Sequence, residues 1–207
     1  MTNRGRSGEA EIAVYVGLGS NIGDREANLC EAIERIKALG LEIKSESSLY
    51  ETEPVGLRDQ PWFLNLVIET MIVDVLTSEY GPVLGDPETT ATIQGEALLS
   101  ELLKIEDEMG RERTIPDGPR VIDIDLLLFG DKIIAHSKDD EEWSVIDSTD
   151  VFVPHPRMHL RRFVLEPLCE IAPEIVHPVL RTTCREMLAS LDDDSGVRIY
   201  RQRSPRR

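Results

Sequence analysis

The chain has 207 residues, of which 41% are hydrophobic and 30% are charged, and its formal net charge is -16. A chain of this length and composition can bury one substantial core, and its apolar runs are too short to span a bilayer. The negative charge disfavours binding to nucleic acid or to an anionic membrane surface. We therefore expect a globular protein that has neither of these as a partner.

No linker rich in Gly, Ser or Pro divides the chain, which favours a single domain over residues 12–200. We expect flexible tails at residues 1–11 and 201–207, and the first of these has no apolar segment typical of a signal peptide. The three cysteines are far apart and form no CxxC pair, which argues against a disulfide framework and against a zinc site. These features predict a cytoplasmic protein.

The chain begins with a predicted strand and helix. Residues 12–16 (IAVYV) form a short apolar, β-branched run that predicts a buried strand. Gly17 and Gly19 follow this run and predict a sharp turn. The next segment predicts an amphipathic helix, with Asp24 as its N-cap and Gly40 as its stop.

Two more strands and a second helix are expected before the middle of the chain. Residues 41–50 and residues 63–73 are rich in apolar and β-branched side chains, which predicts two strands. Residues 74–95 contain prolines, glycines and threonines without a sustained period, and we expect a surface insertion there. Leucines at helical spacing over residues 96–109 predict a helix that ends at Gly110.

Residues 121–129 (VIDIDLLLF) are the most strand-like segment of the chain, and a turn at Gly130 leads to a short predicted strand at residues 132–135. The acidic stretch at residues 137–150 predicts a second surface insertion. The remaining elements are a strand at residues 151–154, helices at residues 162–171 and 183–191, and an edge strand at residues 197–200. This mixed order predicts an α/β (α+β) ferredoxin-like sandwich, with a mainly antiparallel sheet and flanking helices.

Asp123 and Asp125 lie two residues apart on the most strand-like segment, so their side chains should share one face of the sheet. Two neighbouring carboxylates repel each other unless a cation lies between them, and Mg²⁺ accepts one or two carboxylates together with phosphate oxygens. The pair alone is weak evidence for a metal site. The alternative is a pair of exposed carboxylates at the end of a strand.

Three arginines, Arg111, Arg113 and Arg120, lie on a loop with Gly and Pro that leads directly into the acidic strand. Arginines and Mg²⁺ together are the usual means of holding a polyphosphate and neutralising its transition state. The pattern therefore indicates phosphoryl-transfer chemistry. The competing explanation is a structural loop whose arginines pair with the acidic surface.

The string GLGSNIGD resembles a glycine-rich phosphate loop only superficially. It lacks the GKS or GKT ending and the GxGxxG spacing, so we do not predict a nucleotide cradle. Its glycines more plausibly allow a tight turn, from which Ser20 and Asn21 can form hydrogen bonds with a neighbouring loop.

Other side chains could contact a ligand. His155 and Arg161 follow a predicted strand end and could reach a phosphate, although a lone histidine is more often structural. Phe63 and Phe163, with Asn65 beside the first, could bind a planar heterocycle that has hydrogen-bond donors and acceptors. Without further information, core packing is the better explanation for both phenylalanines.

The chain resembles the 6-hydroxymethyl-7,8-dihydropterin pyrophosphokinases of folate biosynthesis in six strings that occur in order: VGLGSNIGDREANL, SSLYETEPVG, DQPWFLNLV, GPRVIDIDLLLFG, VPHPRMHLRRFVLEPL and EIAPEIVHP. The resemblance covers most of residues 12–190. It implies a ferredoxin-like fold and transfer of the β,γ-pyrophosphoryl group of ATP to the hydroxymethyl oxygen of the pterin, with release of AMP.

The resemblance also implies a role for individual residues. Asp123 and Asp125 would bind two Mg²⁺ ions, and with them Arg111, Arg113 and Arg120 would be catalytic. The residues expected to contact ATP are Glu106, Arg120, His155 and Arg161. The residues expected to contact the pterin are Thr52, Pro54, Val55, Gly56, Phe63, Asn65 and Phe163. We expect a monomer whose partners are these two small molecules.

The sequence departs from the family pattern just before GPR, where an Arg-Trp pair is common and this chain has Pro116 and Asp117. This change removes a cation and an aromatic ring from the loop expected to close over the substrates. It leaves two other hypotheses open: a family member that binds pterin or nucleotide without turnover, and an acidic interaction protein that keeps only the scaffold.

Overall fold

The computed structural model describes residues 12–72, 87–112, 115–135 and 152–202. Within these residues an antiparallel sheet has the strand order β5-β1-β4-β3-β8, and β2 also pairs with β4. Its strands are β1 (Ile12–Ser20), β2 (Glu42–Glu46), β3 (Leu49–Thr52), β4 (Phe63–Ile72), β5 (Asp123–Phe129) and β8 (Val197–Arg201). A separate small sheet pairs β6 (Ile134–Ala135) with β7 (Phe152–Val153).

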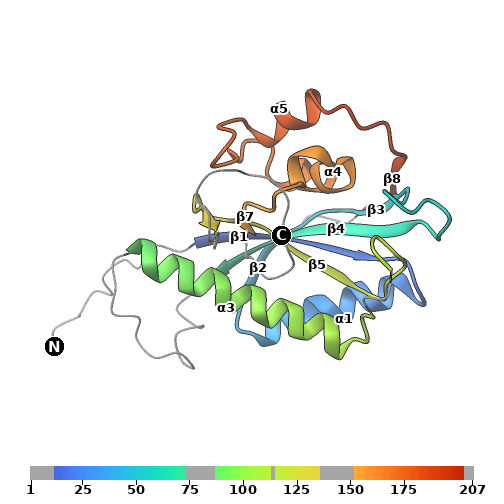
Figure 1. Cartoon of the computed structure of the whole chain (residues 1–207), viewed down its shortest axis with the longest axis horizontal. Coiled ribbons are helices and arrows are strands. Elements are labelled where there is room, and N and C mark those ends of the chain that lie inside the picture. Colours follow the sequence, from blue (N-terminus) through green and yellow to red (C-terminus); the bar gives the residue numbers. More distant parts are fainter. Residues whose placement is uncertain (1–11, 73–86, 113–114, 136–151, 203–207) are drawn as a thin grey trace.

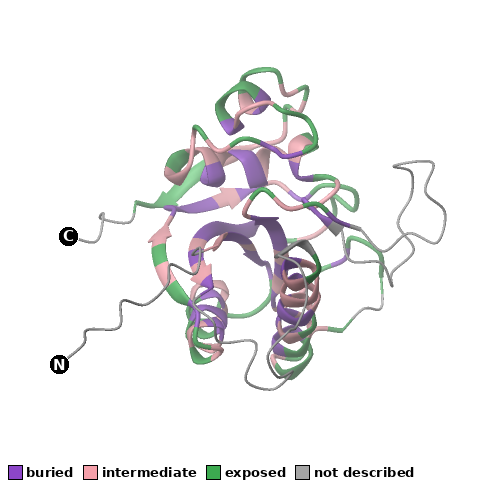
Figure 2. Cartoon of the chain, turned by 90° about the vertical axis from the view of Figure 1, so that its left-hand side faces the viewer, coloured by how far each residue is buried: buried purple, intermediate pink, exposed green. Residues whose placement is uncertain are grey.

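Helices cover both faces of the main sheet (Figure 1). The helical elements are α1 (Arg25–Ala38), α3 (Pro87–Glu108), the 3-10 turn η1 (Met158–Leu160), α4 (Arg162–Ile171) and α5 (Cys184–Ala189). One face packs against α1 and α3, and the other packs against α4 and α5. Figure 2 shows the buried residues concentrated in the sheet and on the helix faces turned toward it.

The alternation of side chains along β1 explains the two cores. Val14, Val16 and Leu18 face α1 and α3, whereas Tyr15 joins the core beneath α4. The order β1-α1-β2/β3-β4-α3-β5, with β1 between β4 and β5, confirms the predicted ferredoxin-like α/β sandwich.

The predicted turn at Gly17 and Gly19 is wrong, because β1 continues through both glycines to Ser20. Each glycine pairs with a residue of β4 on one side and with a residue of β5 on the other. Neighbours on both sides keep this segment extended, although glycine favours turns in isolated sequence. The turn begins only at Asn21.

The predicted helix at residues 96–109 begins earlier, at Pro87, so residues 87–95 are helical and are not part of a loop. Proline is well tolerated in the first helical turn, and the buried Ala91 extends the helical stripe of Leu98 and Leu102. Residues 74–86, the remainder of the predicted insertion, lie outside the described residues, as does the whole insertion at 137–150.

Other predictions can be compared with the structure directly. The strand predicted at residues 41–50 is two strands, since the buried Ser47 and Ser48 interrupt it. The N-cap at Asp24 is confirmed, because its Oδ1 accepts a hydrogen bond from the Ala27 N–H at 3.1 Å. The helix at residues 162–171 is also confirmed. No helix in the described part of the chain is long and apolar enough to cross a membrane.

His177 is a buried histidine beside η1. Because it is buried, its protonation should make the unfolding free energy depend on pH. The residue is 1% exposed, and its Nδ1 accepts hydrogen bonds from the N–H groups of Val179 (3.3 Å) and Leu180 (3.2 Å). The ring of His159 lies edge-on to it, with 6.0 Å between centroids. Burial, and then His159, lower the pKa of His177 to about 4.

We expect the unfolding free energy to fall by about 2 kcal/mol when the pH is lowered from 7.5 to 5, because His177 takes up a proton in the unfolded chain. The unfolded chain binds this proton below its ordinary pKa near 6.5, whereas the folded chain binds it only below about 4. Urea unfolding at the two pH values measures the loss. The matched control is His177→Asn, which keeps an acceptor near Nδ1 and cannot titrate; an equal loss in both proteins would contradict the prediction.

Candidate active site

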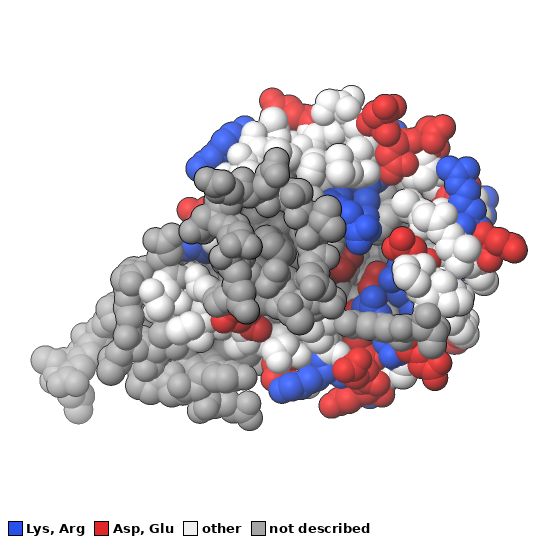
Figure 3. Space-filling view, viewed as in Figure 1, with Lys and Arg blue, Asp and Glu red and all other residues white. Residues whose placement is uncertain are grey.

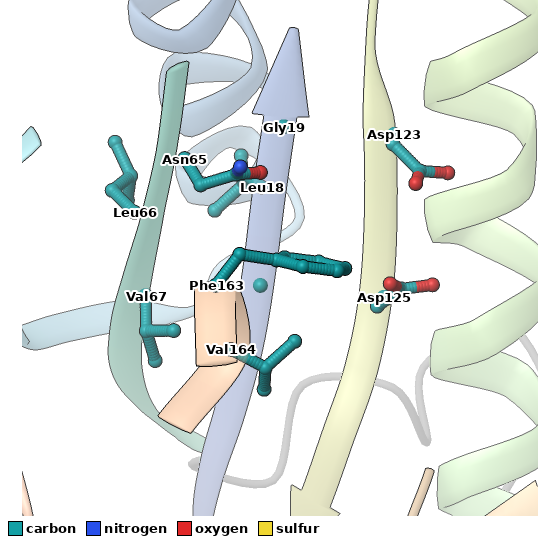
Figure 4. Close-up of a pocket in the computed structure, with 10 residues that line it drawn as sticks. Leu18, Gly19, Asn65, Leu66, Val67, Asp123, Asp125, Phe163 and Val164 are labelled. Atoms are coloured by element: carbon teal, nitrogen blue, oxygen red, sulfur yellow. The ribbon is translucent and has the colours of Figure 1, made fainter. Parts of the chain in front are cut away.

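Two rows of residues cross the sheet on the face that packs against α4. One row joins Asn65 of β4, Gly19 of β1 and Asp123 of β5. The next row joins Val67, Gly17 and Asp125 in the same strands. Asp123 and Asp125 therefore share one face, as the sequence predicts, and Ile124 between them is buried on the opposite face (Figure 4).

Arginines neutralise the first of these carboxylates. Arg111 Nη1 lies 2.7 Å from Asp123 Oδ1, and Arg120 Nη1 lies 3.5 Å from Asp123 Oδ2. Burial and the charge of Asp125 raise the pKa of Asp123, and the two arginines oppose this shift. A pair of carboxylates with this mutual repulsion is suited to share a cation.

His155 lies beside the second carboxylate. Its Nε2 is 3.8 Å from Asp125 Oδ1, and its Nδ1 accepts a hydrogen bond from the Arg157 N–H at 3.2 Å. Burial lowers the pKa of His155, while Asp125 acts in the opposite direction. The imidazole is therefore a neutral group next to the carboxylate at neutral pH.

Glu106, expected to contact ATP, is wholly buried on α3. Its Oε1 accepts hydrogen bonds from the Ile124 N–H at 2.6 Å and from Arg111. Burial raises the pKa of Glu106 to about 7, although Arg111 favours the charged form. Glu106 thus contacts Arg111 and the backbone of β5, and its expected contact with ATP stays a prediction.

An open cavity of about 230 Å³ lies beside Asp123. Two aromatic rings face it, and each is covered by a guanidinium group. The Cζ of Arg120 is 5.4 Å from the centroid of Phe63, and the Cζ of Arg161 is 5.4 Å from the centroid of Phe163. The other residues that line the cavity are Thr52, Glu53, Val55, Asn65, Asp117, Arg157 and Leu160.

A polar pair lies at the base of this cavity. Asn65 Nδ2 donates a hydrogen bond to Thr52 Oγ1 at 2.7 Å, and both side chains are buried. Val55, in contrast, is 45% exposed at the cavity mouth. Figure 4 shows the amide of Asn65 and the ring of Phe163 over β1, on the same side as the two aspartates.

Asn21 links the segments on either side of the cavity. Its Nδ2 donates to Gln60 Oε1 and to the Pro61 carbonyl, each at 3.0 Å, and its Oδ1 accepts from the Arg120 N–H at 2.8 Å. The expectation that Asn21 forms hydrogen bonds with a neighbouring loop is confirmed. The position of the Arg120 backbone is fixed by this contact.

Asp117 adds a carboxylate to the cavity, at the point where the chain departs from the family pattern. Its φ is 52°, a left-handed value that is uncommon outside glycine, and its carbonyl accepts a hydrogen bond from Gln60 Nε2 at 2.8 Å. Its side chain lies against Gly56, where a Cβ would crowd the carboxylate. Its negative charge also acts on Arg161.

The structure thus brings most of the predicted site together. Thr52, Val55, Phe63, Asn65, Arg120, Asp123, Arg161 and Phe163 line one cavity, and Asp125 and His155 lie beside it. Pro54 is buried. Arg111 pairs with Asp123 but does not line the cavity, and Arg113 lies outside the described residues. Sequence reasoning missed Arg157, Glu53 and Leu160; the repeated arginines of PRMHLRR were a signal for the first.

Charged side chains surround the cavity on the surface of the chain. In Figure 3, Lys and Arg side chains border a hollow in a face that also carries many Asp and Glu side chains. The cavity lining has three arginines, Arg120, Arg157 and Arg161, and three carboxylates, Glu53, Asp117 and Asp123, so cations are concentrated there in a chain of net charge -16 without making the lining positive overall.

Comparison with known proteins identifies the family. The profile of the 7,8-dihydro-6-hydroxymethylpterin-pyrophosphokinase (HPPK) family matches residues 15–79 and 87–173. This chain belongs to that family. The 2-amino-4-hydroxy-6-hydroxymethyldihydropteridine pyrophosphokinase of Bacillus subtilis is 35% identical over 92% of this chain and 91% of its own length. The folic acid synthesis protein fol1 of Pneumocystis carinii is 36% identical, but the matched part is 81% of this chain and only 18% of that protein.

Solved structures agree on the fold. An HPPK-DHPS protein in complex with substrates has a TM-score of 0.58 and 15% identity, covering 87% of this chain and 43% of its own. Wild-type HPPK-DHPS of Plasmodium falciparum has a TM-score of 0.55 and 18% identity, covering 86% and 43%. This HPPK chain therefore spans less than half the length of these two-part proteins.

The two carboxylates of this HPPK chain suit Mg²⁺, which takes only some of its ligands from the protein. They do not suit a metal whose ligands all come from the protein. No group of three or more His, Cys, Asp or Glu side chains that could hold a metal ion occurs among residues 12–72, 87–112, 115–135 and 152–202. Asp123 and Asp125 supply two hard oxygen donors on one face, and Mg²⁺ commonly completes such a site with water and substrate phosphates.

We expect Arg111→Met to lower the unfolding free energy by about 3 kcal/mol, because it leaves Glu106 and Asp123 without their shared cation in a buried position. Urea unfolding at pH 7.5 measures the change. Arg198→Met is the matched control, since its pair with Glu51 involves an arginine side chain that is 69% exposed and should cost at most about 1 kcal/mol. Equal losses in the two variants would refute this ranking.

Proposed function

We propose that this chain transfers the β,γ-pyrophosphoryl group of ATP to the hydroxymethyl oxygen of 6-hydroxymethyl-7,8-dihydropterin and releases AMP. The observation that carries the proposal is the row Asn65, Gly19 and Asp123. Neighbouring strands are about 4.8 Å apart, so an amide suited to a heterocycle and a carboxylate suited to Mg²⁺ lie about 10 Å apart across one strand. That separation suits an acceptor next to a polyphosphate.

The proposed acceptor site uses the aromatic and amide groups of the cavity. Phe63 and Phe163 present ring faces to the cavity, and their guanidinium neighbours lie where a flat ring could replace them. Asn65 and Thr52 form the polar end of this cavity, where an amide and backbone groups can read the edge of a pterin. The backbone at residues 53–56 completes this part of the site.

The proposed donor site uses the aspartates and the arginines. Asp123 and Asp125 would hold two Mg²⁺ ions, and Mg²⁺ supplies charge neutralisation and alignment of the phosphates when bound. Arg120 and Arg161 face the same cavity and would contact phosphate oxygens, and His155 lies next to Asp125. Arg113, by the family resemblance, would add a further cation.

The reaction then requires positioning more than covalent chemistry by the protein. The hydroxymethyl oxygen forms a bond to the β-phosphorus of ATP, its proton leaves, and the bond from that phosphorus to the α,β-bridging oxygen breaks to release AMP. The arginines stabilise charge that develops on the transferred group, and the rings hold the acceptor in line. Asp117 lies on the loop before Arg120 and lines the cavity, and its charge opposes phosphate binding there.

We also propose that the chain acts as a monomer in the cytoplasm. Phe63, Asn65, Phe163, Arg120 and Asp123, which the proposed reaction uses, line one cavity, so the proposal needs no residue of a second copy. The three cysteines are free thiols, and Cys30 is exposed, which suits a reducing compartment.

The defining test is AMP formation that needs ATP, Mg²⁺ and the pterin alcohol together, measured by chromatography that separates AMP from ADP. Asp123→Asn and Asp125→Asn should each lower the rate roughly hundredfold or more, because they remove metal-binding charge without changing shape. Asp131→Asn is the matched control, since that side chain is 87% exposed just after β5. Release of ADP, or ligand binding without AMP, would exclude the proposed reaction and favour a different transferase or a binding protein.

We expect Phe163→Ala to raise the KM for the pterin about tenfold or more while leaving the KM for ATP nearly unchanged, because stacking on an aromatic ring contributes about 1–3 kcal/mol. Steady-state kinetics with each substrate varied in turn measure the two values. Phe163→Tyr keeps the flat ring and serves as the control. If the Ala and Tyr variants behave alike, the ring does not bind the pterin.

A further inference from the structure

Gly19 lies between the two halves of the proposed site. Its partners across the sheet are Asn65 on β4 and Asp123 on β5. Figure 4 shows the Asn65 side chain lying beside Gly19, on the face that carries Asp123. Gly19 is not among the glycines with positive φ in the described residues, so the backbone itself does not require a glycine there.

The space that a Cβ on Gly19 would fill is already taken by Asn65. Such a Cβ would clash with Asn65 Oδ1, because the two atoms would be closer than real Cβ contacts ever are. It would also lie 3.5 Å from Asn65 Cγ and 3.8 Å from Phe63 Cδ1. The other end of the amide is held by the 2.7 Å hydrogen bond from Asn65 Nδ2 to Thr52 Oγ1. The amide is thus held between the Thr52 hydroxyl and the bare backbone of Gly19.

We infer that Gly19 is a positioning residue for the acceptor substrate: its missing side chain sets the orientation in which Asn65 presents its amide to a planar, hydrogen-bonding heterocycle. This inference rests on the proposed role of Asn65 in binding the pterin. It gives the GLGS string a role that is neither a phosphate cradle nor a turn.

The same strand supplies a matched control. Gly17 points to the same side of β1 as Gly19, but a Cβ there would lie 3.4 Å from Leu127 Cδ1, which is an ordinary van der Waals distance. A methyl group at Gly17 therefore fits without displacing any neighbour. A methyl group at Gly19 must displace Asn65, and because it meets the end of a side chain, the fold can absorb it by rotating that side chain.

The experiment compares Gly19→Ala, Gly17→Ala, Asn65→Ala and the double variant Gly19→Ala/Asn65→Ala. We expect Gly19→Ala to raise the KM for the pterin about tenfold, the effect of losing a hydrogen bond to a buried polar group, with the KM for ATP changed less than about twofold. Gly17→Ala should keep both values. The double variant should equal Asn65→Ala alone, because no amide remains to be displaced.

The results distinguish the role of Gly19 from the proposed role of Asn65 in binding the pterin. If Asn65→Ala leaves the KM for the pterin unchanged, the proposed role of Asn65 fails. If Asn65→Ala raises that KM but Gly19→Ala does not, or if the two effects add in the double variant, the inference about Gly19 fails and the role of Asn65 stands.

Thermal unfolding covers the case in which Gly19→Ala does not fold. The added Asn65→Ala change removes the overlapping atoms, so the double variant should recover a cooperative transition. A double variant that remains unfolded would overturn the inference, because the methyl group would then clash with something other than Asn65.

Discussion

The pairing of β1 with β4 on one side and β5 on the other is the constraint on which the site depends. It places Asn65, Gly19 and Asp123 in one row, although these residues come from three distant parts of the chain. A shift of one residue in either register would turn these side chains to the opposite face, toward α1 and α3. The spacing between Asn65, proposed to bind the acceptor, and the carboxylates proposed to bind the metal is therefore a property of strand geometry and not of loops.

A second constraint is the set of ion pairs and hydrogen bonds made by Glu106 and Arg111 at the edge of the sheet. β5 is the last strand of the sheet, and Glu106 covers its free edge by accepting the Ile124 N–H. Arg111 then joins Glu106 to Asp123, so the buried carboxylate of α3 and a carboxylate of β5 share one cation. A helix, a loop and a strand are therefore coupled by one arginine at the point where phosphates are expected to bind.

The elements that the sequence predicted best are those whose pattern is local. The helix at residues 162–171 and the cap at Asp24 depend on side-chain period and on neighbouring residues, and both are as expected. The misjudged segments contain residues whose local preference was overridden by tertiary contacts. Glycines in β1 stay extended between two strands, and Gly95 allows α3 to pass close to Ile134, a fit that no local pattern indicates.

Short motifs and the period of a strand were enough to indicate the family resemblance, the shared face of Asp123 and Asp125, and candidate residues for a polyphosphate and a flat ring. Which of those residues meet became known from the folded chain. It placed Glu106 out of reach of solvent, added Arg157 and Asp117 to the cavity, and put the Asn65 amide over Gly19. Such contacts join residues far apart in the chain, and they depend on strand register and side-chain packing, which no local sequence pattern specifies.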